Sequence, residues 1–462
     1  MIILEKYAGK NIGVLGLARS GSAIIKAMQY GGAVVQAWDD SETARNNIAH
    51  NNINEDNGNI APQIINYENW DWAKLDLLVV SPAIQLNPHN LGNLKTHPAV
   101  ELARKNNVRI TCDISLLMEQ CPDAIFVGIT GTNGKSTTTA LIAHSLAQIG
   151  ARVECGGNIG VAALELAPLG LGEYYVLELS SYQLEAMDTG TLNIACLLNI
   201  TPDHLERHGR MEHYVTAKER IFQGQGANDR AIIALDDEYL REIHTRHPHA
   251  ITVSAKSQQN NPNYYVKSNK LIDGDVELDL SMMKSLQGAH NHQNALIAYA
   301  TLRALGFDAT LIAQAMQSFQ GLPHRMERIA EWDGMLWVND SKATNADAAQ
   351  QSLATYRNIH WIVGGALKQG GIDSLAYLQS HVTHAYVIGA QTEAIATSLE
   401  QMNISYDICG TMNQAVMAAF ESARGQNNAV ILLAPAAASF DQYSNFEERG
   451  EHFRDLVLGL KS

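Results

Sequence analysis

Ile125-Phe-Val-Gly-Ile-Thr130-Gly-Thr-Asn-Gly-Lys135-Ser136 is the most informative stretch of the sequence. Its first five residues are apolar and predict a buried parallel strand, and the residues after Lys135 have the apolar spacing of a helix. A strand, a turn with glycines and a helix N-terminus form an anion site, because backbone N–H groups and the helix dipole point to one place. Lys135 adds a full positive charge, and Ser136 adds a hydroxyl that suits Mg²⁺. We therefore predict that ATP binds at Gly131, Thr132, Asn133, Gly134, Lys135, Ser136 and Thr137.

One position of this stretch departs from the strict P-loop pattern. Ile129 stands where that pattern has its first glycine. The alternative interpretation is an ordinary strand-to-helix turn that contains Gly-Lys-Ser by chance. The order of strand, turn and helix favours the nucleotide site.

Length and composition limit the class of protein. A chain of 462 residues is expected to form two or three domains, and 46% hydrophobic with 18% charged residues is typical of a globular protein with a large core. The net charge of −15 argues against nonspecific nucleic-acid binding, which needs a basic face. Anionic substrates remain compatible with this charge, because two opposite charges about 4 Å apart attract by ~4 kcal/mol at an effective dielectric of ~20.

The cysteines and the apolar runs predict a cytoplasmic protein that does not insert into a membrane. The five cysteines form no Cys-x-x-Cys pair, so we expect reduced thiols. Met1-Ile-Ile-Leu-Glu-Lys does not read as a signal peptide. The longest apolar run, residues 429–439, is too short to span a bilayer.

The N-terminal segment predicts half of a dinucleotide-type βαβ unit. A strand at residues 11–15 leads through Gly16-Leu-Ala18-Arg-Ser-Gly21 into a helix at residues 22–30 and a second strand at 33–38. Ala18 replaces the second glycine of the fingerprint, which argues against a tight NAD site and leaves a looser diphosphate site possible. Asp39 either accepts a hydrogen bond from a ribose or uracil or caps the turn that follows it.

Further strands complete this first unit. The asparagine-rich residues 45–63 are expected to form an exposed loop. A buried strand at residues 75–80 ends at Ser81-Pro82, and ligands dock after strand ends in open α/β sheets. A last strand at residues 108–111 places the domain boundary at Cys112-Asp113.

The central segment predicts further polar groups beside the Lys135 turn. Glu178 ends an apolar strand at residues 174–177, and an acidic group opposite a P-loop commonly holds Mg²⁺. His204 follows a strand at residues 194–200, so the strand ends that carry Lys135, Glu178 and His204 should meet at one edge of a sheet. Lys218 lies on the apolar face of a helix, where a lysine snorkels, pairs or loses its proton.

The C-terminal third predicts another parallel sheet. Four apolar strands, at residues 335–338, 360–363, 385–388 and 430–433, alternate with helical stretches. We therefore predict an α/β fold with three domains. They are a Rossmann-like domain at residues 1–112, a P-loop ATPase-like parallel sheet at 113–321 and a Rossmann-like domain at 322–462.

Motifs along essentially the whole chain resemble the Mur ligase family. They are Thr130-Gly-Thr-Asn-Gly-Lys-Ser136, Gly157-Asn158-Ile-Gly160, Glu178-Leu-Ser-Ser-Tyr-Gln-Leu-Glu185, Asp203-His204, Tyr214-x-x-Ala-Lys218, His290-Asn291-x-x-Asn294, Pro323-His-Arg325, Asn339-Asp-Ser-Lys-Ala-Thr-Asn345 and Ser439-Phe-Asp-Gln-Tyr-Ser-Asn-Phe446. A family member that adds diaminopimelate would show Asp-Asn-Pro-Arg, which this sequence lacks. A folylpolyglutamate synthase would show Asp-Gly-Ala-His-Asn-Pro where this sequence has Asn339-Asp-Ser-Lys342.

The resemblance implies an ATP-dependent acid–amino-acid ligase of peptidoglycan precursor synthesis. Such a ligase would add D-glutamate to UDP-N-acetylmuramoyl-L-alanine through an acyl phosphate. The implied partners are these small molecules and ATP, with no nucleic acid and no membrane insertion, and the expected state is a monomer. Two Mg²⁺ ions are the implied cofactors.

The resemblance also implies roles for individual residues. The implied catalytic residues are Lys135, Glu178, His204 and Lys218. Besides the Lys135 turn, the implied ATP contacts are Asn291, Asn294, Arg325, Asp340 and Lys342. The implied contacts of the UDP-sugar are Gly16, Arg19, Ser20, Asp39, Ser81, Pro82, Asn158 and His204. The implied contacts of D-glutamate are Thr344, Lys368, Ser439 and Phe446. The implied metal ligands are Ser136, Glu178, His204 and Lys218, the last as a carbamate, because CO₂ converts its amine into a carboxylate-like ligand.

Two other classes of protein compete with the ligase. A nicotinamide enzyme built on the first βαβ unit would bind NAD tightly and leave Lys135 unexplained. A non-catalytic nucleotide-binding module would bind ATP without turnover and leave Lys218, Lys342 and Lys368 as ordinary solvated lysines.

Overall fold

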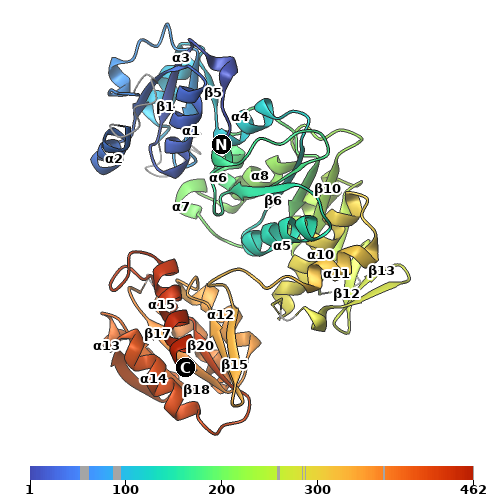
Figure 1. The fold of residues 1–462 in the computed structure, drawn as a ribbon, viewed down its shortest axis with the longest axis vertical. Coiled ribbons are helices and arrows are strands. Elements are labelled where there is room, and N and C mark those ends of the chain that lie inside the picture. Colours follow the sequence, from blue (N-terminus) through green and yellow to red (C-terminus); the bar gives the residue numbers. More distant parts are fainter. Residues whose placement is uncertain are drawn as a thin grey trace. The chain divides into compact units, whose positions relative to one another are not determined.

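Three β-sheets follow one another along the chain in the computed structural model (Figure 1). The structure describes residues 1–52, 62–86, 95–256, 261–283, 285–286, 288–367 and 370–460. The chain forms two compact units, one of residues 1–279 with 293–316 and the other of residues 280–292 with 317–462. The first two sheets belong to the first unit and the third sheet belongs to the second, so the α/β fold class predicted from the sequence is confirmed.

The first sheet is parallel and has the order β3-β2-β1-β4-β5. Its strands are β1 (Asn11–Leu15), β2 (Val34–Trp38), β3 (Gln63–Ile64), β4 (Leu77–Val80) and β5 (Arg109–Thr111). The helices of this part are α1 (Arg19–Tyr30), α2 (Glu42–Asn52), α3 (Pro98–Lys105) and α4 (Asp113–Gln120). The order of the strands reverses between β1 and β4, and ligands of open α/β sheets bind at such a switch point.

One prediction for this part is wrong. Residues 45–52 belong to helix α2, where the sequence led us to expect an exposed loop. Ile48 is 4% exposed, so this apolar side chain is buried although most residues of the helix are polar. The prediction for residues 53–61 lies outside the described residues.

The central sheet has nine strands in the order β14-β13-β12-β11-β10-β9-β6-β8-β7. Its strands are β6 (Ile125–Thr130), β7 (Val153–Gly157), β8 (Tyr174–Glu178), β9 (Ile194–Leu197), β10 (Arg230–Ala234), β11 (Ile251–Ser254), β12 (Tyr264–Lys267), β13 (Lys270–Asp273) and β14 (Val276–Asp279). Strand β6 lies between β8 and β9 and is parallel to both, so the ends of these three strands meet at one edge, as predicted. Strands β12 to β14 add an antiparallel edge that the sequence analysis did not predict.

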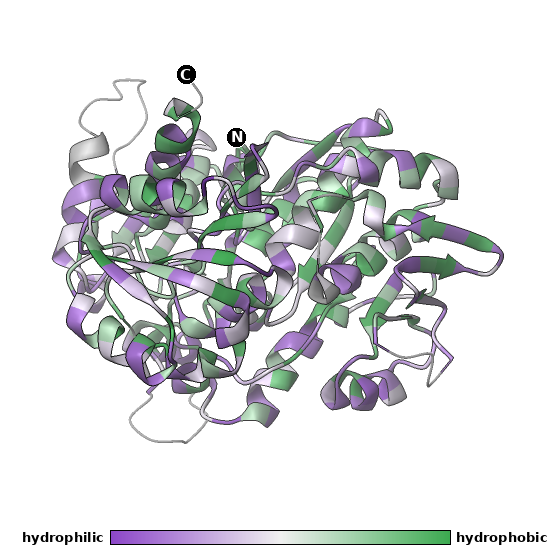
Figure 2. Cartoon of the chain, turned by 90° about the horizontal axis from the view of Figure 1, so that it is seen from below, coloured by the Kyte–Doolittle hydropathy of each residue, from purple (hydrophilic) through white to green (hydrophobic). Residues whose placement is uncertain are grey.

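Helices connect and cover the central strands. They are α5 (Lys135–Gln148), α6 (Ser181–Ala186), α7 (Leu205–His208), α8 (Met211–Glu219), α9 (Glu238–Arg246), α10 (Ala289–Ala304) and α11 (Ala309–Gln317), with the 3₁₀ turns η3 (Ala163–Glu165) and η4 (Arg220–Phe222). Figure 2 shows hydrophobic stretches along the strands and hydrophilic ones on loops and on outward turns of the helices. This pattern fits a sheet that is covered on both faces, whose strands read as continuous apolar runs.

The third sheet has the order β15-β16-β20-β17-β18-β19. Its strands are β15 (Glu327–Trp332), β16 (Met335–Asn339), β17 (Ile359–Gly364), β18 (Val382–Ile388), β19 (Tyr406–Gly410) and β20 (Ala429–Leu433). Its helices are α12 (Ala346–Thr355), α13 (Thr392–Gln401), α14 (Met412–Ala423) and α15 (Phe446–Gly459), with the 3₁₀ segment η6 (Asp373–His381). The four predicted strands are parallel, and β15 is an added antiparallel edge.

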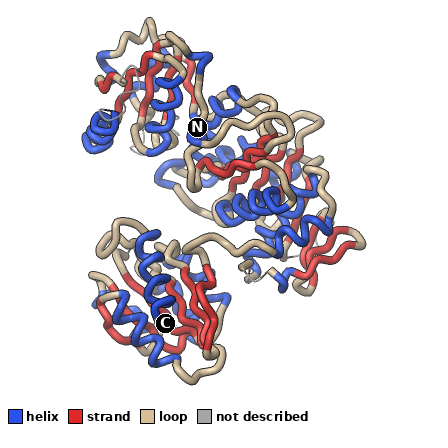
Figure 3. Tube along the Cα trace, in the orientation of Figure 1, coloured by secondary structure: helices blue, strands red, loops and turns tan. Residues whose placement is uncertain are grey.

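Each face of the third sheet has its own apolar core. Figure 3 shows the strands and the helices that contribute to these cores. Trp361 and Val363 pack on one face with side chains of α12, α13 and η6. Ile362, which lies between them in the strand, packs on the other face with side chains of α14 and α15. The alternation follows from the two-residue period of a strand, and β17 is buried at every position because helices cover both of its sides.

Two predictions about the whole chain can be compared with the structure. All five cysteines are free thiols, as expected. Within the described residues, no helix has both the length and the apolar character that crossing a membrane requires.

Candidate active site

The turn between β6 and α5 is built around a left-handed glycine. Gly134 precedes the first helical residue, Lys135, and has a φ of +82°. A Cβ atom on Gly134 would lie 2.2 Å from Oδ1 of Asn294, so no other residue fits there without moving Asn294. The close approach brings α10 against the turn, where the Thr138 hydroxyl also donates to Asn294 Oδ1 over 3.2 Å.

Two lysine side chains converge on one carbonyl group of this turn. Nζ of Lys135 lies 2.9 Å from the carbonyl oxygen of Gly131 and 2.8 Å from that of Thr132. Nζ of Lys218 donates to the same Gly131 oxygen over 2.8 Å. The structure therefore places the predicted Lys218 at the predicted phosphate turn.

Lys218 is only 2% exposed. Burial, with the nearby positive charge of Lys135, holds the pKa of its amine well below the usual value. Its Nζ lies 4.7 Å from the ring centre of Tyr214, whose hydroxyl is 3.1 Å from the Thr132 hydroxyl. A buried amine that gives up its proton easily is a nucleophile, which is the property that carbamylation requires.

The carboxylate of Glu178 joins two other predicted residues. It is 2% exposed, and it accepts hydrogen bonds from Oγ of Ser136 over 2.6 Å and from Nδ2 of Asn158 over 2.7 Å. These residues come from α5, from the end of β8 and from the loop after β7, and the order of the strands brings them together.

The chemistry of this group fits Mg²⁺. Glu178 and Ser136 offer oxygen ligands, which Mg²⁺ prefers. Within the described ranges, no three His, Cys, Asp or Glu side chains gather closely enough to form a complete metal cage. Mg²⁺ does not need such a cage, because it usually keeps waters and binds substrate phosphates.

The predicted His204 lies on an exposed turn before α7, with a left-handed φ of +53°. Its ring nitrogens lie 3.5 Å from Asp203 Oδ2 and 3.4 Å from Glu206 Oε1. Its ring centre is 5.2 Å from that of Tyr182. The contacts described for His204 include neither Glu178 nor Lys218, so the structure leaves its metal role as a prediction.

Sequence reasoning missed a residue that shapes the phosphate turn. Oδ1 of Asn199 accepts from the backbone amide of Asn133 over 2.8 Å, and its Nδ2 donates to the carbonyl of Asn133 and to Gln293. Gln293 lies on α10 between Asn291 and Asn294, which are 6% and 3% exposed. The signal in the sequence is an amide side chain just past the end of an apolar strand, which many structural turns share.

At the switch point of the first sheet, Asp39 closes the turn after β1. Its Oδ2 accepts from the amide of Leu17 over 2.6 Å, and its Oδ1 accepts from the amide of Ser41 over 2.8 Å. The structure thus contains the turn cap considered for Asp39, and the contact with the UDP end stays a prediction. Ser81 donates from Oγ to the carbonyl of Gly16 over 2.6 Å, which ties the loop after β4 to the turn after β1.

Two further residues predicted at this switch point have hydrogen bonds beyond the turn itself. Nη1 of Arg19 donates to the carbonyl of Gly160 over 2.6 Å. The Ser20 side chain forms a hydrogen bond with the carboxyl group of Asp113. Burial raises the pKa of Asp113 to about 6, against the opposing effects of the Ile114 amide and of Ser20.

The second unit brings another set of predicted residues together. Asp340 follows β16 and is 7% exposed, and burial raises its pKa to about 6 although the Met326 amide donates to it and Arg325 lies nearby. Lys342 Nζ lies 4.3 Å from the ring centre of Phe446.

Other predicted residues of this unit lie in the same loops. The Thr344 amide donates to the Lys342 carbonyl over 2.8 Å, and Ser439 is 2% exposed. Arg449, which we did not predict, donates from Nη2 to the Ser341 carbonyl over 2.8 Å. Lys368 lies outside the described residues.

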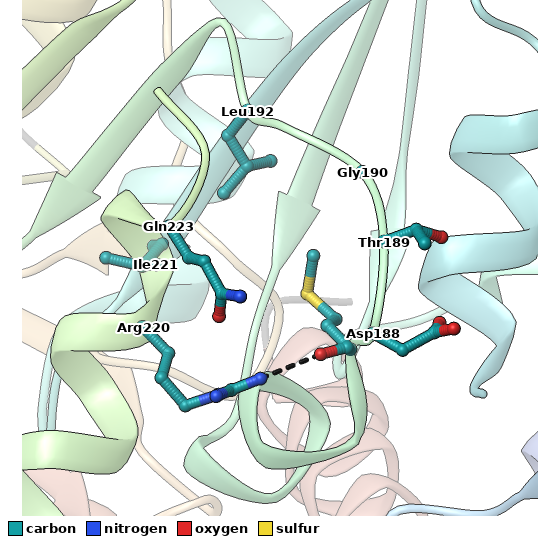
Figure 4. Close-up of a pocket in the computed structure, with 8 residues that line it drawn as sticks. Asp188, Thr189, Gly190, Leu192, Arg220, Ile221 and Gln223 are labelled. Atoms are coloured by element: carbon teal, nitrogen blue, oxygen red, sulfur yellow. Dashed lines mark hydrogen bonds between the residues drawn. The ribbon is translucent and has the colours of Figure 1, made fainter. Parts of the chain in front are cut away.

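A small cavity beside α6 and η4 is separate from these groups (Figure 4). Its lining includes Asp188, Leu192 and Arg220, and Arg220 donates to the carbonyl of Met187 over 2.8 Å. Its volume of about 20 Å³ holds one water molecule and no substrate. The cavity is therefore not a candidate active site.

The fold and the Lys135 turn together place this chain in a class of proteins. These are α/β proteins in which a P-loop-type turn lies at the edge of a central sheet. A family model described as the Mur ligase middle domain matches residues 129–302. A second model, described as Mur ligase, glutamate ligase domain, matches residues 324–437.

Curated relatives match the whole chain. A protein of Paramagnetospirillum magneticum named UDP-N-acetylmuramoylalanine–D-glutamate ligase is 42% identical over 99% of this chain and 98% of its own length. A protein of the same name from Rhodospirillum rubrum is 41% identical over 100% of this chain and 97% of its own length. The chain belongs to the Mur ligase family.

Solved structures share the fold at low sequence identity. The UDP-N-acetylmuramate–alanine ligase MurC of Thermotoga maritima is 20% identical, with a TM-score of 0.58 over 98% of this chain and 99% of its own. The MurF ligase of Thermotoga maritima, solved in complex with ADP, is 17% identical, with a TM-score of 0.57 over 100% of this chain and 98% of its own. At these identities the likeness supports the fold alone.

Proposed function

We propose that the chain is an ATP-dependent ligase that joins D-glutamate to UDP-N-acetylmuramoyl-L-alanine and releases ADP and phosphate. The observation that carries the proposal is the full-length match, at 41–42% identity, to two relatives that bear the name of this ligase. The convergence of Lys135, Ser136, Glu178 and Lys218 at one turn supports the use of a nucleoside triphosphate. The reaction would belong to peptidoglycan precursor synthesis in the cytoplasm, carried out by a monomer.

The reaction would proceed in two steps. The alanyl carboxylate attacks the γ-phosphorus of ATP, which forms an acyl phosphate and releases ADP. The amine of D-glutamate then attacks the acyl carbon, and the tetrahedral intermediate collapses to an amide with loss of phosphate and a proton. Both steps need neutralised phosphate charge and reactants held in line, and good alignment corresponds to effective molarities of ~10⁵–10⁸ M.

The turn after β6 would hold the triphosphate. Lys135 would neutralise the β- and γ-phosphates, and the backbone amides at the start of α5 would face the phosphate oxygens. Asn291 and Asn294 would contact the nucleotide from α10, and the contact of Asn294 with Thr138 supports this position. Arg325, Asp340 and Lys342 would be further contacts of ATP.

Two metal sites would serve the phosphates, and bound Mg²⁺ would supply charge neutralisation there. Ser136 and Glu178 would hold one ion, which their 2.6 Å contact supports. His204 and a carbamate on Lys218 would hold the other. The depressed pKa of Lys218 supports a neutral amine that adds to CO₂ and loses a proton to give the carbamate.

The substrates would divide among three domains. Residues 1–112 would bind UDP through Gly16, Arg19, Ser20, Asp39, Ser81 and Pro82. Residues 113–321 would bind ATP, and Asn158 and His204 would contact the muramoyl-alanine part. Residues 322–462 would bind D-glutamate through Thr344, Lys368, Ser439 and Phe446.

Release of phosphate by the purified protein tests the proposal. Release should require ATP, UDP-N-acetylmuramoyl-L-alanine and D-glutamate together, and L-glutamate or diaminopimelate should not replace D-glutamate. A nicotinamide enzyme would instead bind NAD tightly, and a non-catalytic module would bind ATP without releasing phosphate. Release that is independent of D-glutamate would contradict the proposal.

A further inference from the structure

Arg207 belongs to the central part of the chain, and its side chain donates hydrogen bonds to the loop that follows β4 in the first sheet. Arg207 lies on α7 and its side chain is 8% exposed. Its Nη1 donates to the carbonyl of Ala83 over 2.8 Å, and its Nη2 donates to the carbonyls of Ile84 over 2.8 Å and Pro82 over 3.5 Å. One guanidinium group thus holds three successive carbonyls of the loop after β4.

That loop is anchored on its own side as well. Ser81 donates to the carbonyl of Gly16, and the amide of Ile84 donates to the carbonyl of Ser81 over 3.1 Å. The loop is therefore tied by a hydrogen bond to the turn after β1. These two segments form the switch point of the first sheet, where the UDP end of the substrate would bind.

On its other side, Arg207 is joined to the turn that carries His204. Its backbone amide donates to the carbonyl of His204 over 3.0 Å. Its guanidinium carbon lies 4.6 Å from the ring centre of Tyr182, and the His204 ring packs against the same tyrosine at 5.2 Å. Glu185, whose side chain is 6% exposed, lies 3.4 Å from Nη2 and compensates the buried charge.

A reciprocal contact joins the same two parts of the chain. Arg19, which follows the turn after β1, donates over 2.6 Å to the carbonyl of Gly160 in the central part. Two residues before Gly160, Asn158 donates to Glu178. Arg207 and Arg19 thus each donate from one of these two parts to backbone carbonyls of the other. Arg109 and Thr111 of the first sheet add hydrogen bonds to the side chain of Asp188 at a separate place.

We propose that Arg207 is a positioning residue that sets the separation between the UDP end and the carboxylate end of the nucleotide-sugar. This inference rests on the proposed function, which places the UDP end at Gly16 and Ser81 and the alanyl end near Asn158 and His204. A planar guanidinium donates in several fixed directions at once, whereas a lysine ammonium is a compact point charge on a flexible stem. Arg207→Lys should keep the positive charge but no longer hold the two ends of the nucleotide-sugar site at the same separation.

The consequence should appear in catalysis and not in the binding of either end alone. A misplacement of about 1 Å can lower a rate by about 10²-fold. We expect Arg207→Lys to lower kcat/KM for the nucleotide-sugar by roughly that factor, divided between a lower kcat and weaker binding of the intact nucleotide-sugar. The KM values for ATP and D-glutamate should change by less than about threefold.

The experiment compares ligands that fill only one part of the site with the intact nucleotide-sugar, which spans both its UDP end and its alanyl end. Calorimetric Kd values for UDP, ADP and UDP-N-acetylmuramoyl-L-alanine are measured for the wild type, Arg207→Lys and Arg207→Gln. We expect UDP and ADP to bind as in the wild type and the intact nucleotide-sugar to bind about tenfold more weakly. Arg210→Gln is the matched control, because Arg210 is 60% exposed and lies 3.9 Å from its partner Glu212.

Other outcomes overturn the inference. Equal weakening of UDP and nucleotide-sugar binding would mean that Arg207 only shapes its own loop. Unchanged nucleotide-sugar binding and unchanged kcat would mean that Arg207 has no positioning role. If the Arg207 variants do not fold, Glu185→Gln provides the test, since it keeps the shape of the side chain and removes the charge that compensates Arg207. This variant should also weaken binding of the intact nucleotide-sugar and not of UDP or ADP, by a smaller factor than the Arg207 variants. Failure of the wild type to release phosphate with D-glutamate would overturn the proposed function, whereas the binding comparison would still test Arg207.

Discussion

The turn between β1 and α1 resembles the turn between β6 and α5 in backbone conformation, since each contains a left-handed glycine. The two turns differ in the charged side chains that surround them. Gly16 and Gly134 both adopt a left-handed conformation, with φ of +89° and +82°. In the first turn, the carboxylate of Asp39 already accepts from the amide of Leu17. In the second turn, the amine of Lys135 lies against the turn's own carbonyls.

The difference teaches that the side chains around a glycine turn, more than its backbone, decide which ligand the turn suits. An internal carboxylate competes with a phosphate for the backbone amides, so the first turn suits a ligand held mainly by groups other than those amides. A lysine beside a helix N-terminus adds to the attraction for phosphate, so the second turn suits a triphosphate. The predictions below test this contrast.

Removal of Lys135 should have the largest effect. Lys135→Ala should lower kcat/KM for phosphate release by at least about 10²–10³-fold, because the cation beside the phosphates is lost. The side chain is only half-buried and contacts turn carbonyls, so the fold should persist. Phosphate release and thermal unfolding measure the two effects. A large loss of stability would show that Lys135 is structural.

Removal of Lys218 should come next. Lys218→Ala should lower activity by about 10²-fold or more, and added formate or acetate should restore part of it, because a small carboxylate can take the place of the carbamate. Lys135→Ala is the control, since a carboxylate cannot replace a cation. Activity of Lys218→Ala near that of the wild type would rule out the carbamate.

A substitution in α1, where the helix packs against the first turn, should affect stability more than chemistry. A Cβ atom on Gly21 would lie 1.9 Å from the carbonyl oxygen of Gly16, so Gly21→Ala should destabilise this part of the chain by about 1–3 kcal/mol or more. Hydrogen exchange of the amides in α1 measures the effect. Gly170→Ala is the control, because no atom lies within 4 Å of the added carbon. Unchanged protection of α1 would show that the turn adapts.

The smallest effect concerns pH and the buried Asp113 beside the first turn. Its folded-state pKa of about 6 lies above the ordinary value of 3.8, so its ionisation opposes folding. This cost is absent below about pH 4, grows between pH 4 and pH 6, and is full above pH 6. Asp113→Asn removes the cost, so its stability relative to the wild type should rise by up to about 3 kcal/mol between pH 4 and pH 8. Urea unfolding at both pH values measures this difference, and a difference independent of pH would contradict it.

The sequence predicted those parts of the fold in which burial determines the residue type. Strands β1, β6 and β20 are apolar at nearly every position because they are covered on both faces, so their positions could be inferred. Helix α2 was missed because most of its residues are polar, although the apolar side chain of Ile48 is buried. The edge strands β12 to β14 were missed because many of their side chains are exposed and polar.

The candidate site was predictable where the order of parallel strands determines which side chains meet. The contact of Ser136 with Glu178 follows from β6 and β8 being neighbours. The approach of Lys218 to the Gly131 carbonyl depends on the packing of α8, which no local pattern encodes. Asn199 and Arg207 act through backbone groups far away in the sequence, so their partners could not be inferred from the residues themselves.

The two apolar cores of the third sheet are drawn entirely from residues of the second unit. A body that encloses its own cores can unfold as a cooperative block by itself. Heating the intact chain in a scanning calorimeter would then superimpose separate transitions. An unfolding enthalpy fitted to a single peak would then describe neither unit. A nucleotide that binds only one unit would raise the transition temperature of that unit alone.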